Sequence, residues 1–309
     1  MEHREGCADD PRPDRPAVAP RGSARQLLSR RGFVIGAVAV GVAAVAGVGV
    51  PLLASIISAT EGLRVTPLFE KPGFIVAHRG GSRDWPEMSM EAYRHSVDVG
   101  ANALEISLSR SSDGVWFGLH DSTLDRTSGT KGFVASEHSW AEIRTYRISA
   151  KGTLDKEQPS QPYTRFEDLV DAYANTHTIF VDPKTAERRH HPELIAKMKA
   201  AVDDPSQSFI AKGYCMSKAW PAIATAHGLK SWGYFYGSEV DADPQLLAST
   251  QSRWSSLGMD YAASDAAWKS ALAYAKPVLG HIIADRRAEK FALSRGAAGL
   301  IVSGIKEVL

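Results

Sequence analysis

The chain has 309 residues, enough for one large domain or two ordinary ones, and 36 Lys and Arg nearly balance 35 Asp and Glu. This balance excludes a protein held to nucleic acid by bulk positive charge. The two cysteines, Cys7 and Cys215, offer neither a disulfide framework nor a thiolate metal site.

The N-terminal part has two segments of different character. Residues 1–31 are rich in Pro, Arg and Asp without apolar periodicity, which predicts a disordered cytoplasmic tail. Residues 32–60 carry no charge, and as a helix they would span roughly 40 Å, enough to cross a bilayer. They are therefore expected to be a signal or transmembrane segment, and the arginines before them predict that the N-terminus stays in the cytoplasm.

The junction between these segments resembles a twin-arginine export signal, because the pair Arg30-Arg31 precedes Phe33 and Val34. The alternative is a plain membrane anchor whose arginines follow the positive-inside rule. Both alternatives place the chain after about residue 62 outside the cytoplasm. The expected partners are thus the membrane and, in the first case, the export machinery.

Strand-like and helix-like runs alternate over residues 67–309, a pattern typical of a parallel sheet flanked by helices. We count nine strand candidates, one more than a (β/α)8 TIM barrel needs, and the weakest is Met259–Ala263. A TIM barrel is the expected fold. An open doubly wound sheet ranks second, because no G-x-G-x-x-G follows a strand. Residues 121–165 lack a strong period and are expected to form an excursion over the barrel mouth.

Three early apolar runs each end in residues that can do chemistry. The run 74–77 leads into His78 and Arg79, the second run contains Glu105, and the third leads into His120 and Asp121. Sites in parallel α/β folds are built at the C-terminal tips of strands, so these side chains should converge in one mouth.

The same stretch carries a family resemblance in the order and spacing of five motifs. These are His78-Arg79-Gly80, Pro86-Glu87-Met88, Glu105-x-Ser107, Asp113-Gly114, and His120-Asp121-x-x-Leu124-x-Arg126-Thr127. The segment resembles the signature of glycerophosphodiester phosphodiesterases, in which Asn usually stands at the position of Met88 and Asp at that of Ser107. The resemblance is good over residues 74–127 and weak elsewhere.

The resemblance implies an active site for phosphodiester hydrolysis. His78 and His120 are the expected catalytic acid and base, and Arg79 and Lys184 are the expected phosphate-binding cations. A divalent cation, Ca²⁺ or Mg²⁺, is expected on Glu105 and Asp182. Because Ser107 replaces a usual Asp ligand, metal affinity should drop, or Glu87 should join Ser107 in completing the ligand set.

The sequence therefore predicts a metal-dependent hydrolase that converts glycerophosphodiesters, or related lipid-headgroup diesters, into an alcohol and glycerol 3-phosphate. The second hypothesis is a phosphate- or headgroup-binding protein with weak or no catalysis, motivated by Ser107. The third is a lyase-type phospholipase D that forms a cyclic phosphate on the same barrel.

Overall fold

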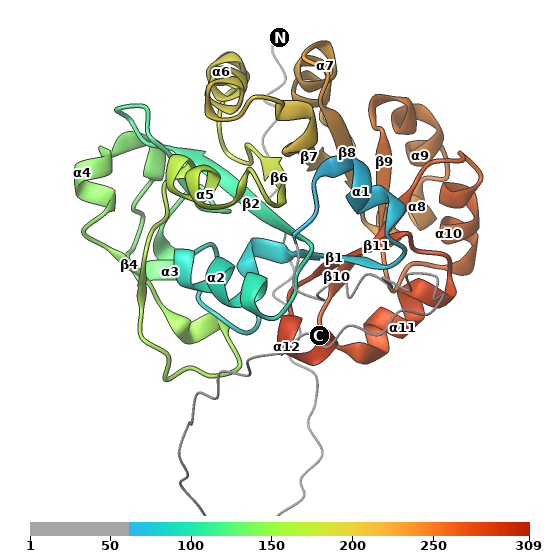
Figure 1. Ribbon diagram of the computed structural model, residues 1–309, viewed down its shortest axis with the longest axis horizontal. Coiled ribbons are helices and arrows are strands. Elements are labelled where there is room, and N and C mark those ends of the chain that lie inside the picture. Colours follow the sequence, from blue (N-terminus) through green and yellow to red (C-terminus); the bar gives the residue numbers. More distant parts are fainter. Residues whose placement is uncertain (1–61) are drawn as a thin grey trace, which may run out of the picture. The chain divides into compact units, whose positions relative to one another are not determined.

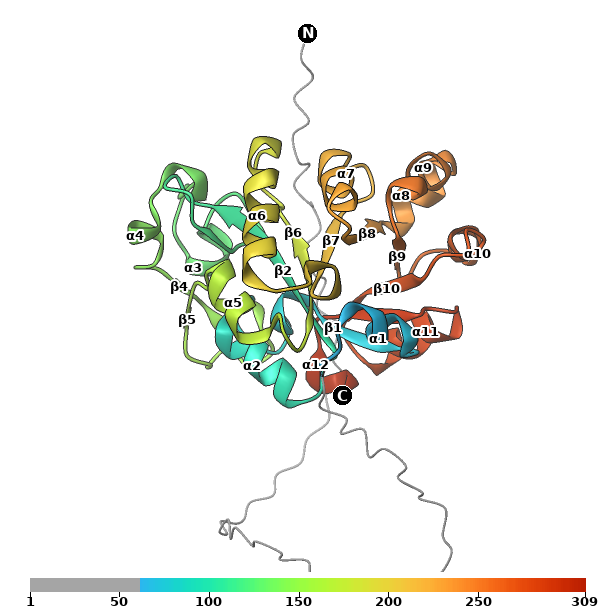
Figure 2. The same cartoon turned by 45° about the horizontal axis from the view of Figure 1, so that its top comes forward.

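Eight parallel strands close into a barrel within residues 62–309, the part of the chain that this computed structural model describes (Figures 1 and 2). Strand β1 pairs with both β2 and β11, which closes the ring. The barrel strands are β1 Phe74–Ala77, β2 Ala103–Arg110, β6 Thr178–Asp182, β7 Phe209–Tyr214, β8 Lys230–Phe235, β9 Ser256–Asp260, β10 Val278–Ile283 and β11 Gly299–Val302.

Helices surround this barrel, and several begin at a capping side chain that accepts a backbone hydrogen bond. Ser89 caps α2, Ser264 caps α10 and Asp285 caps α11. The helices are α1 Val65–Glu70, α2 Met90–Asp98, α3 Asp125–Ser128, α4 Trp140–Ile143, α5 Phe166–Tyr173, α6 His191–Ala201, α7 Ala219–Ala226, α8 Gly237–Ala242, α9 Gln245–Thr250, α10 Asp265–Leu272, α11 Arg286–Ser294 and α12 Ile305–Val308.

The expected TIM barrel is confirmed, but the surplus strand is a different one from the one we suspected. Met259–Ala263 was the weakest candidate, whereas β9, Ser256–Asp260, is a full member of the barrel. The extra strand is β3, Trp116–Gly118, which pairs antiparallel with β2 outside the ring. A short turn can return the chain only antiparallel to the strand that it leaves, so β3 could not be a barrel strand.

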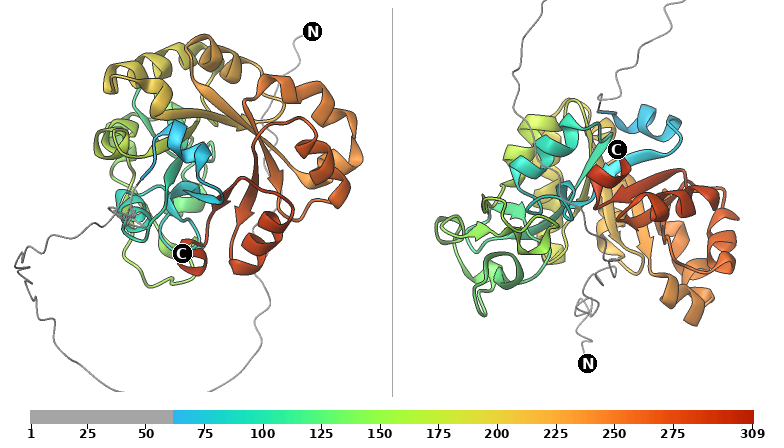
Figure 3. Two further views of the ribbon diagram at one scale, coloured as in Figure 1. Left: turned by 45° about the vertical axis from the view of Figure 1, so that its right-hand side comes forward. Right: turned by 90° about the horizontal axis from the view of Figure 1, so that it is seen from below.

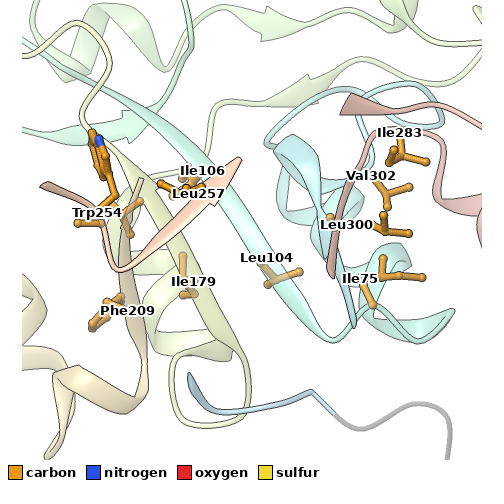
Figure 4. Close-up of a cluster of buried hydrophobic side chains, with 14 of the residues drawn as sticks. Ile75, Leu104, Ile106, Ile179, Phe209, Trp254, Leu257, Ile283, Leu300 and Val302 are labelled. Carbon is orange, nitrogen blue, oxygen red and sulfur yellow. The ribbon is translucent and has the colours of Figure 1, made fainter. Parts of the chain in front are cut away.

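Side chains alternate along each barrel strand, and this alternation separates two apolar clusters. Residues such as Leu104 and Ile106 on β2 and Leu300 and Val302 on β11 point outward into the layer shared with the helices (Figure 4). The inward positions near the start of the strands form the second cluster, with Val76, Ala103, Phe180, Ile210, Trp232, Leu279 and Ile301. The same alternation then brings polar side chains inward at the next positions along β2, β6 and β7.

Residues 119–165 connect β3 to α5 and contain the expected excursion, residues 121–165, which lies on the side of β2 (Figure 3). It has its own small core of Leu119, Leu124, Ala135, Ile143, Ile148 and Tyr163, together with Phe117 of β3. It also contains the short ladder of β4, Arg147–Ile148, and β5, Gln161–Pro162. The chain contacts the first loop of the barrel where Leu154 donates its N–H to the carbonyl of Arg83 at 2.9 Å.

The expected tail, residues 1–31, and the expected signal or transmembrane segment, residues 32–60, lie outside the described residues. Within residues 62–309, no helix is both long and apolar enough to cross a bilayer.

Candidate active site

The first loop begins where β1 ends, and its backbone is shaped to reach the next strand. Arg79 adopts a left-handed conformation with φ of 49°, which aims its N–H at Glu105 Oε2 at 2.8 Å. Gly80 and Gly81 follow with φ of 72° and 80°, conformations in which the backbone of a residue with a side chain would be strained. A Cβ on Gly80 would also lie 3.0 Å from the Cβ of Ala92 in α2. The loop is therefore fixed against both β2 and α2.

His78 is buried at the tip of β1, and its Nδ1 has no hydrogen-bond partner among the described residues. Burial, followed by the charges of Arg79 and Lys212, holds the pKa of His78 well below its usual value. The imidazole is thus neutral at pH 7 and has one ring nitrogen uncommitted to the protein.

His120 follows β3 at the start of the excursion and is oriented by its neighbour. Its Nδ1 lies 2.7 Å from Asp121 Oδ1, and the pKa of Asp121 is lowered because hydrogen bonding to His120 and the charge of Arg126 outweigh burial. An ionised carboxylate can only accept, so Nδ1 carries the proton and donates it to Asp121. Burial, followed by the charge of Arg79, lowers the pKa of His120 to about 4, which leaves Nε2 free to accept a proton at neutral pH.

Arg126 joins the excursion to the first loop through two carboxylates. It donates to Asp121 Oδ2 at 2.6 Å and to the two oxygens of Glu87 at 2.8 and 2.9 Å. Arg79 approaches Glu87 less closely, at 3.4 Å. The charges of these two arginines outweigh burial and lower the pKa of Glu87 to about 2. Glu87 is therefore engaged by guanidinium groups, and its placement does not fit the expected role of a metal ligand.

The inward residues of β2, β6 and β7 meet around one ammonium group. Lys212 Nζ lies 2.9 Å from Glu105 Oε1 and 3.0 Å from Asp182 Oδ2, and Ser107 donates its hydroxyl to the same Glu105 oxygen at 3.1 Å. All four residues are buried, with Glu105 and Ser107 at 0% exposure. Burial opposes the charge of Lys212, but Glu105 and Asp182 outweigh it and raise the pKa of Lys212.

Lys184 and Tyr234 lie beside this group. Lys184 Nζ donates to the hydroxyl of Tyr234 at 2.7 Å, and Lys184 and Lys212 each lie 5.2 Å from the centre of the Tyr234 ring. His281 of β10 is buried against Trp232, Tyr234 and Tyr236, with its Nε2 3.0 Å from the carbonyl of Phe235. It is a wall residue of the barrel interior.

The residues present do not fit a divalent cation at the expected place. Glu105 and Asp182 come together as expected, but the ammonium of Lys212 lies between them, and Ser107 contributes no negative charge. Among residues 62–309, no three His, Cys, Asp or Glu side chains are grouped so that they could hold a metal ion.

Lys212 is the main site residue that we did not identify from the sequence. The sequence did contain an indication of its role. Lys212 is the one charged residue of the strand Phe209–Tyr214, and it lies on the same face of that strand as Ile210 and Tyr214. A lysine on the inward face of a barrel strand requires buried anionic partners, which are Glu105 and Asp182 here.

Comparisons with known proteins support the sequence resemblance. A family model described as "Glycerophosphoryl diester phosphodiesterase family" matches residues 78–255. Glycerophosphodiester phosphodiesterase 1 of Rattus norvegicus is 34% identical over 110 residues, which are 35% of this chain and 33% of that protein. The human protein of the same name is 33% identical over 110 residues, with the same coverage. The match thus spans about a third of the length of these curated relatives.

Solved structures share the fold at low identity. An Oleispira antarctica phosphodiesterase, solved in complex with sn-glycerol-3-phosphate, aligns with a TM-score of 0.61 and 16% identity over 78% of this chain and 97% of that one. Glycerophosphodiester phosphodiesterase from Agrobacterium tumefaciens aligns with a TM-score of 0.60 and 14% identity over 76% and 99%.

Proposed function

The chain belongs to the glycerophosphoryl diester phosphodiesterase family, and from this premise we propose that it hydrolyses glycerophosphodiesters, or related lipid-headgroup diesters. The products are an alcohol and glycerol 3-phosphate. The observation that carries the proposal is the pair of neutral histidines, His78 and His120, beside Arg79 at the ends of β1 and β3.

The two histidines divide the proton transfers in this mechanism. His120 holds its Nδ1 proton on Asp121, so its Nε2 takes the proton of the attacking oxygen, from water or from a neighbouring hydroxyl of the substrate. His78 protonates the leaving alkoxide. Its pKa is low in the free protein, and the negative charge of a bound phosphodiester favours its protonated form. Arg79 and Lys184 bind the phosphoryl oxygens.

The test measures turnover of a panel of glycerophosphodiesters by the full chain in mild detergent, with phosphorus NMR of the products. His78→Ala and His120→Ala should each lower kcat by about 10²–10⁴, the usual contribution of a general acid or base. His227→Ala, at an exposed position after α7, is the matched control and should retain full rate. Full activity in both site variants would refute the assignment.

Two other activities are separated by the same assay. A phosphate- or headgroup-binding protein with weak catalysis is favoured by Ser107 and by the lysine between Glu105 and Asp182, because both reduce the likeness to the family's expected metal site. It would bind glycerophosphodiesters without releasing alcohol. A lyase-type phospholipase D would release a cyclic phosphate, which has its own phosphorus resonance.

We further propose that the barrel acts outside the cytoplasm. The support is the uncharged stretch 32–60 and the preceding pair Arg30-Arg31. Fractionation of cells that express the full chain should find residues 62–309 accessible to added protease. Replacement of both arginines by lysine should block this exposure if the twin-arginine machinery exports the protein, and should leave it unchanged for a plain anchor.

A further inference from the structure

The ammonium group of Lys212 occupies the place between two carboxylates where a divalent cation was expected. It contacts Glu105 and Asp182 at nearly equal distances, 2.9 and 3.0 Å, and its side chain is 5% exposed. These are charge-assisted hydrogen bonds of ordinary length. Both carboxylates thus already have a cation that is covalently part of the chain.

The backbone explains why this lysine reaches the site. Lys212 follows Ile210 by two residues on β7, so it points into the barrel one layer above the apolar cluster. Asp182 ends the neighbouring strand β6, and Ser107 of β2 lies opposite it in register. Three adjacent strands therefore supply the ammonium, the two carboxylates and the hydroxyl that donates to Glu105.

The charges of this cluster also oppose a metal ion. Glu105 and Asp182 contribute two negative charges, Lys212 removes one, and Ser107 adds none where a third carboxylate would complete a strong site for a hard cation. A divalent ion on the same carboxylates would meet the repulsion of an ammonium group within contact distance, in a site buried from water.

We propose that Lys212 is the built-in cation of this site and that the protein binds its phosphodiester without a divalent metal ion. The catalytic part of this inference rests on the proposed function; the metal-binding part does not. Arg79 and Lys184 supply the positive charge that meets the phosphoryl oxygens, and Lys212 offsets one of the two buried carboxylate charges that would otherwise repel the phosphodiester. Glu105 and Asp182 hold the ammonium in place.

The decisive experiment measures metal binding and turnover separately. The full chain in mild detergent is dialysed against Ca²⁺ and against Mn²⁺, and bound metal is counted by mass spectrometry. The natural sequence should hold less than about a tenth of an equivalent, and chelator should change turnover by less than about twofold. One equivalent of bound metal, or loss of turnover on chelation, would overturn the proposal.

Variants show whether Lys212 is what excludes the ion. Ser107→Asp alone should still bind no metal, because the ammonium remains. The double variant Ser107→Asp with Lys212→Ala has three carboxylates and an empty space between them, so it should bind about one equivalent and gain thermal stability on adding Ca²⁺. Metal binding by Ser107→Asp alone would contradict the role of Lys212, and so would a folded double variant without affinity.

Two further replacements of Lys212 distinguish a role of its charge in turnover from a role in stability alone. Lys212→Arg keeps the charge and should retain turnover better than Lys212→Met, which leaves two buried carboxylates without their cation. Lys197→Met, at the half-exposed pair with Glu167, is the control for loss of a lysine and should behave like the natural sequence. Equal turnover by Lys212→Met and the natural sequence would refute the role of the ammonium in phosphate binding. If no variant turns over any diester, the proposed function fails while the metal counts still decide the inference.

Discussion

Asp121 controls which nitrogen of His120 is available for chemistry. Its Oδ1 accepts from His120 Nδ1, and its Oδ2 accepts from Arg126, which is itself held by the buried carboxylate of Glu87. The imidazole therefore has a fixed tautomer, and its Nε2 is the nitrogen left to accept a proton. Both oxygens of Asp121 are thus engaged by protein groups, and Asp121 acts through His120 as a positioning residue.

Replacing Asp121 by Asn should lower kcat by about 10- to 100-fold with little change in KM, because the amide can donate to Nδ1 and stabilise the wrong tautomer. Steady-state kinetics on a diester that the natural sequence turns over would measure this split. Asp98→Asn, at the exposed pair with Arg94 on α2, is the control. An unchanged kcat at an unchanged melting temperature would show that His120 does not depend on Asp121.

Some residues of this site were predicted from the sequence and others were not, for physical reasons that differ from one residue to the next. Motif spacing brought His78, Glu105 and His120 into consideration, and the structure brings all three to the same end of the barrel. The family motifs do not extend to β7, so Lys212 could be identified only from the alternation of side chains along that strand. Met88 has φ of 56°, a conformation that Asn, the residue expected there from the resemblance, tolerates better than Met.

At the scale of elements, glycines on β7, β8 and β9 each lie directly under the indole ring of a tryptophan from a neighbouring segment. Trp254 covers Gly233, where an added Cβ would lie 2.3 Å from its ring, and it also reaches Gly213. Trp254 is buried and donates its indole N–H to the carbonyl of Cys215 at 3.2 Å. The glycines thus leave room for an indole that seals the barrel wall against the helices.

Gly233→Ala should lower the free energy of unfolding by about 1–3 kcal/mol, because the new methyl group collides with the indole ring of Trp254 and neither backbone can retreat easily. Chemical denaturation would measure the change. Gly152→Ala is the matched control, since nothing lies within 4 Å of a Cβ there and its φ is unstrained. Equal stability of the two variants would mean that the wall around Trp254 is loosely packed.

The alternating pattern identified every strand of the barrel, but the choice of the surplus strand and one boundary were wrong for local reasons. Gly114 has φ of 92° and closes a tight turn with Ser111, so the dipeptide Asp113-Gly114 already indicated a hairpin between β2 and β3. The strand β9 contains Gly258 and begins at Ser256, which weakened its apolar signal and shifted our prediction toward residue 263.

At the scale of the whole described chain, several buried histidines have a pKa that burial lowers. Burial lowers the pKa of His120, His177 and His281 to about 4 and that of His78 well below its usual value. The unfolded chain takes up protons on these groups near pH 6.5, so between pH 6.5 and about 4 it binds more protons than the folded chain. The unfolding free energy must therefore fall as the pH drops through that window.

The predicted loss between pH 7 and pH 5.5 is about 1 kcal/mol for each histidine whose pKa is lowered to about 4. The melting temperature should drop steadily over this range, and calorimetry of the full chain in detergent would follow it.

His177 is the position at which to test the cause, because it lies outside the candidate site, is buried, and has an Nε2 without a hydrogen-bond partner among the described residues. His177→Asn keeps a group that can bond to Thr176 but cannot titrate, so its pH dependence should be shallower by one histidine's share. His227→Ala, at an exposed position after α7, should leave the slope unchanged. Equal slopes for His177→Asn and the natural sequence would refute burial of neutral histidines as the source of acid sensitivity, and the carboxylates paired with Arg126 and Lys212 would then have to account for it.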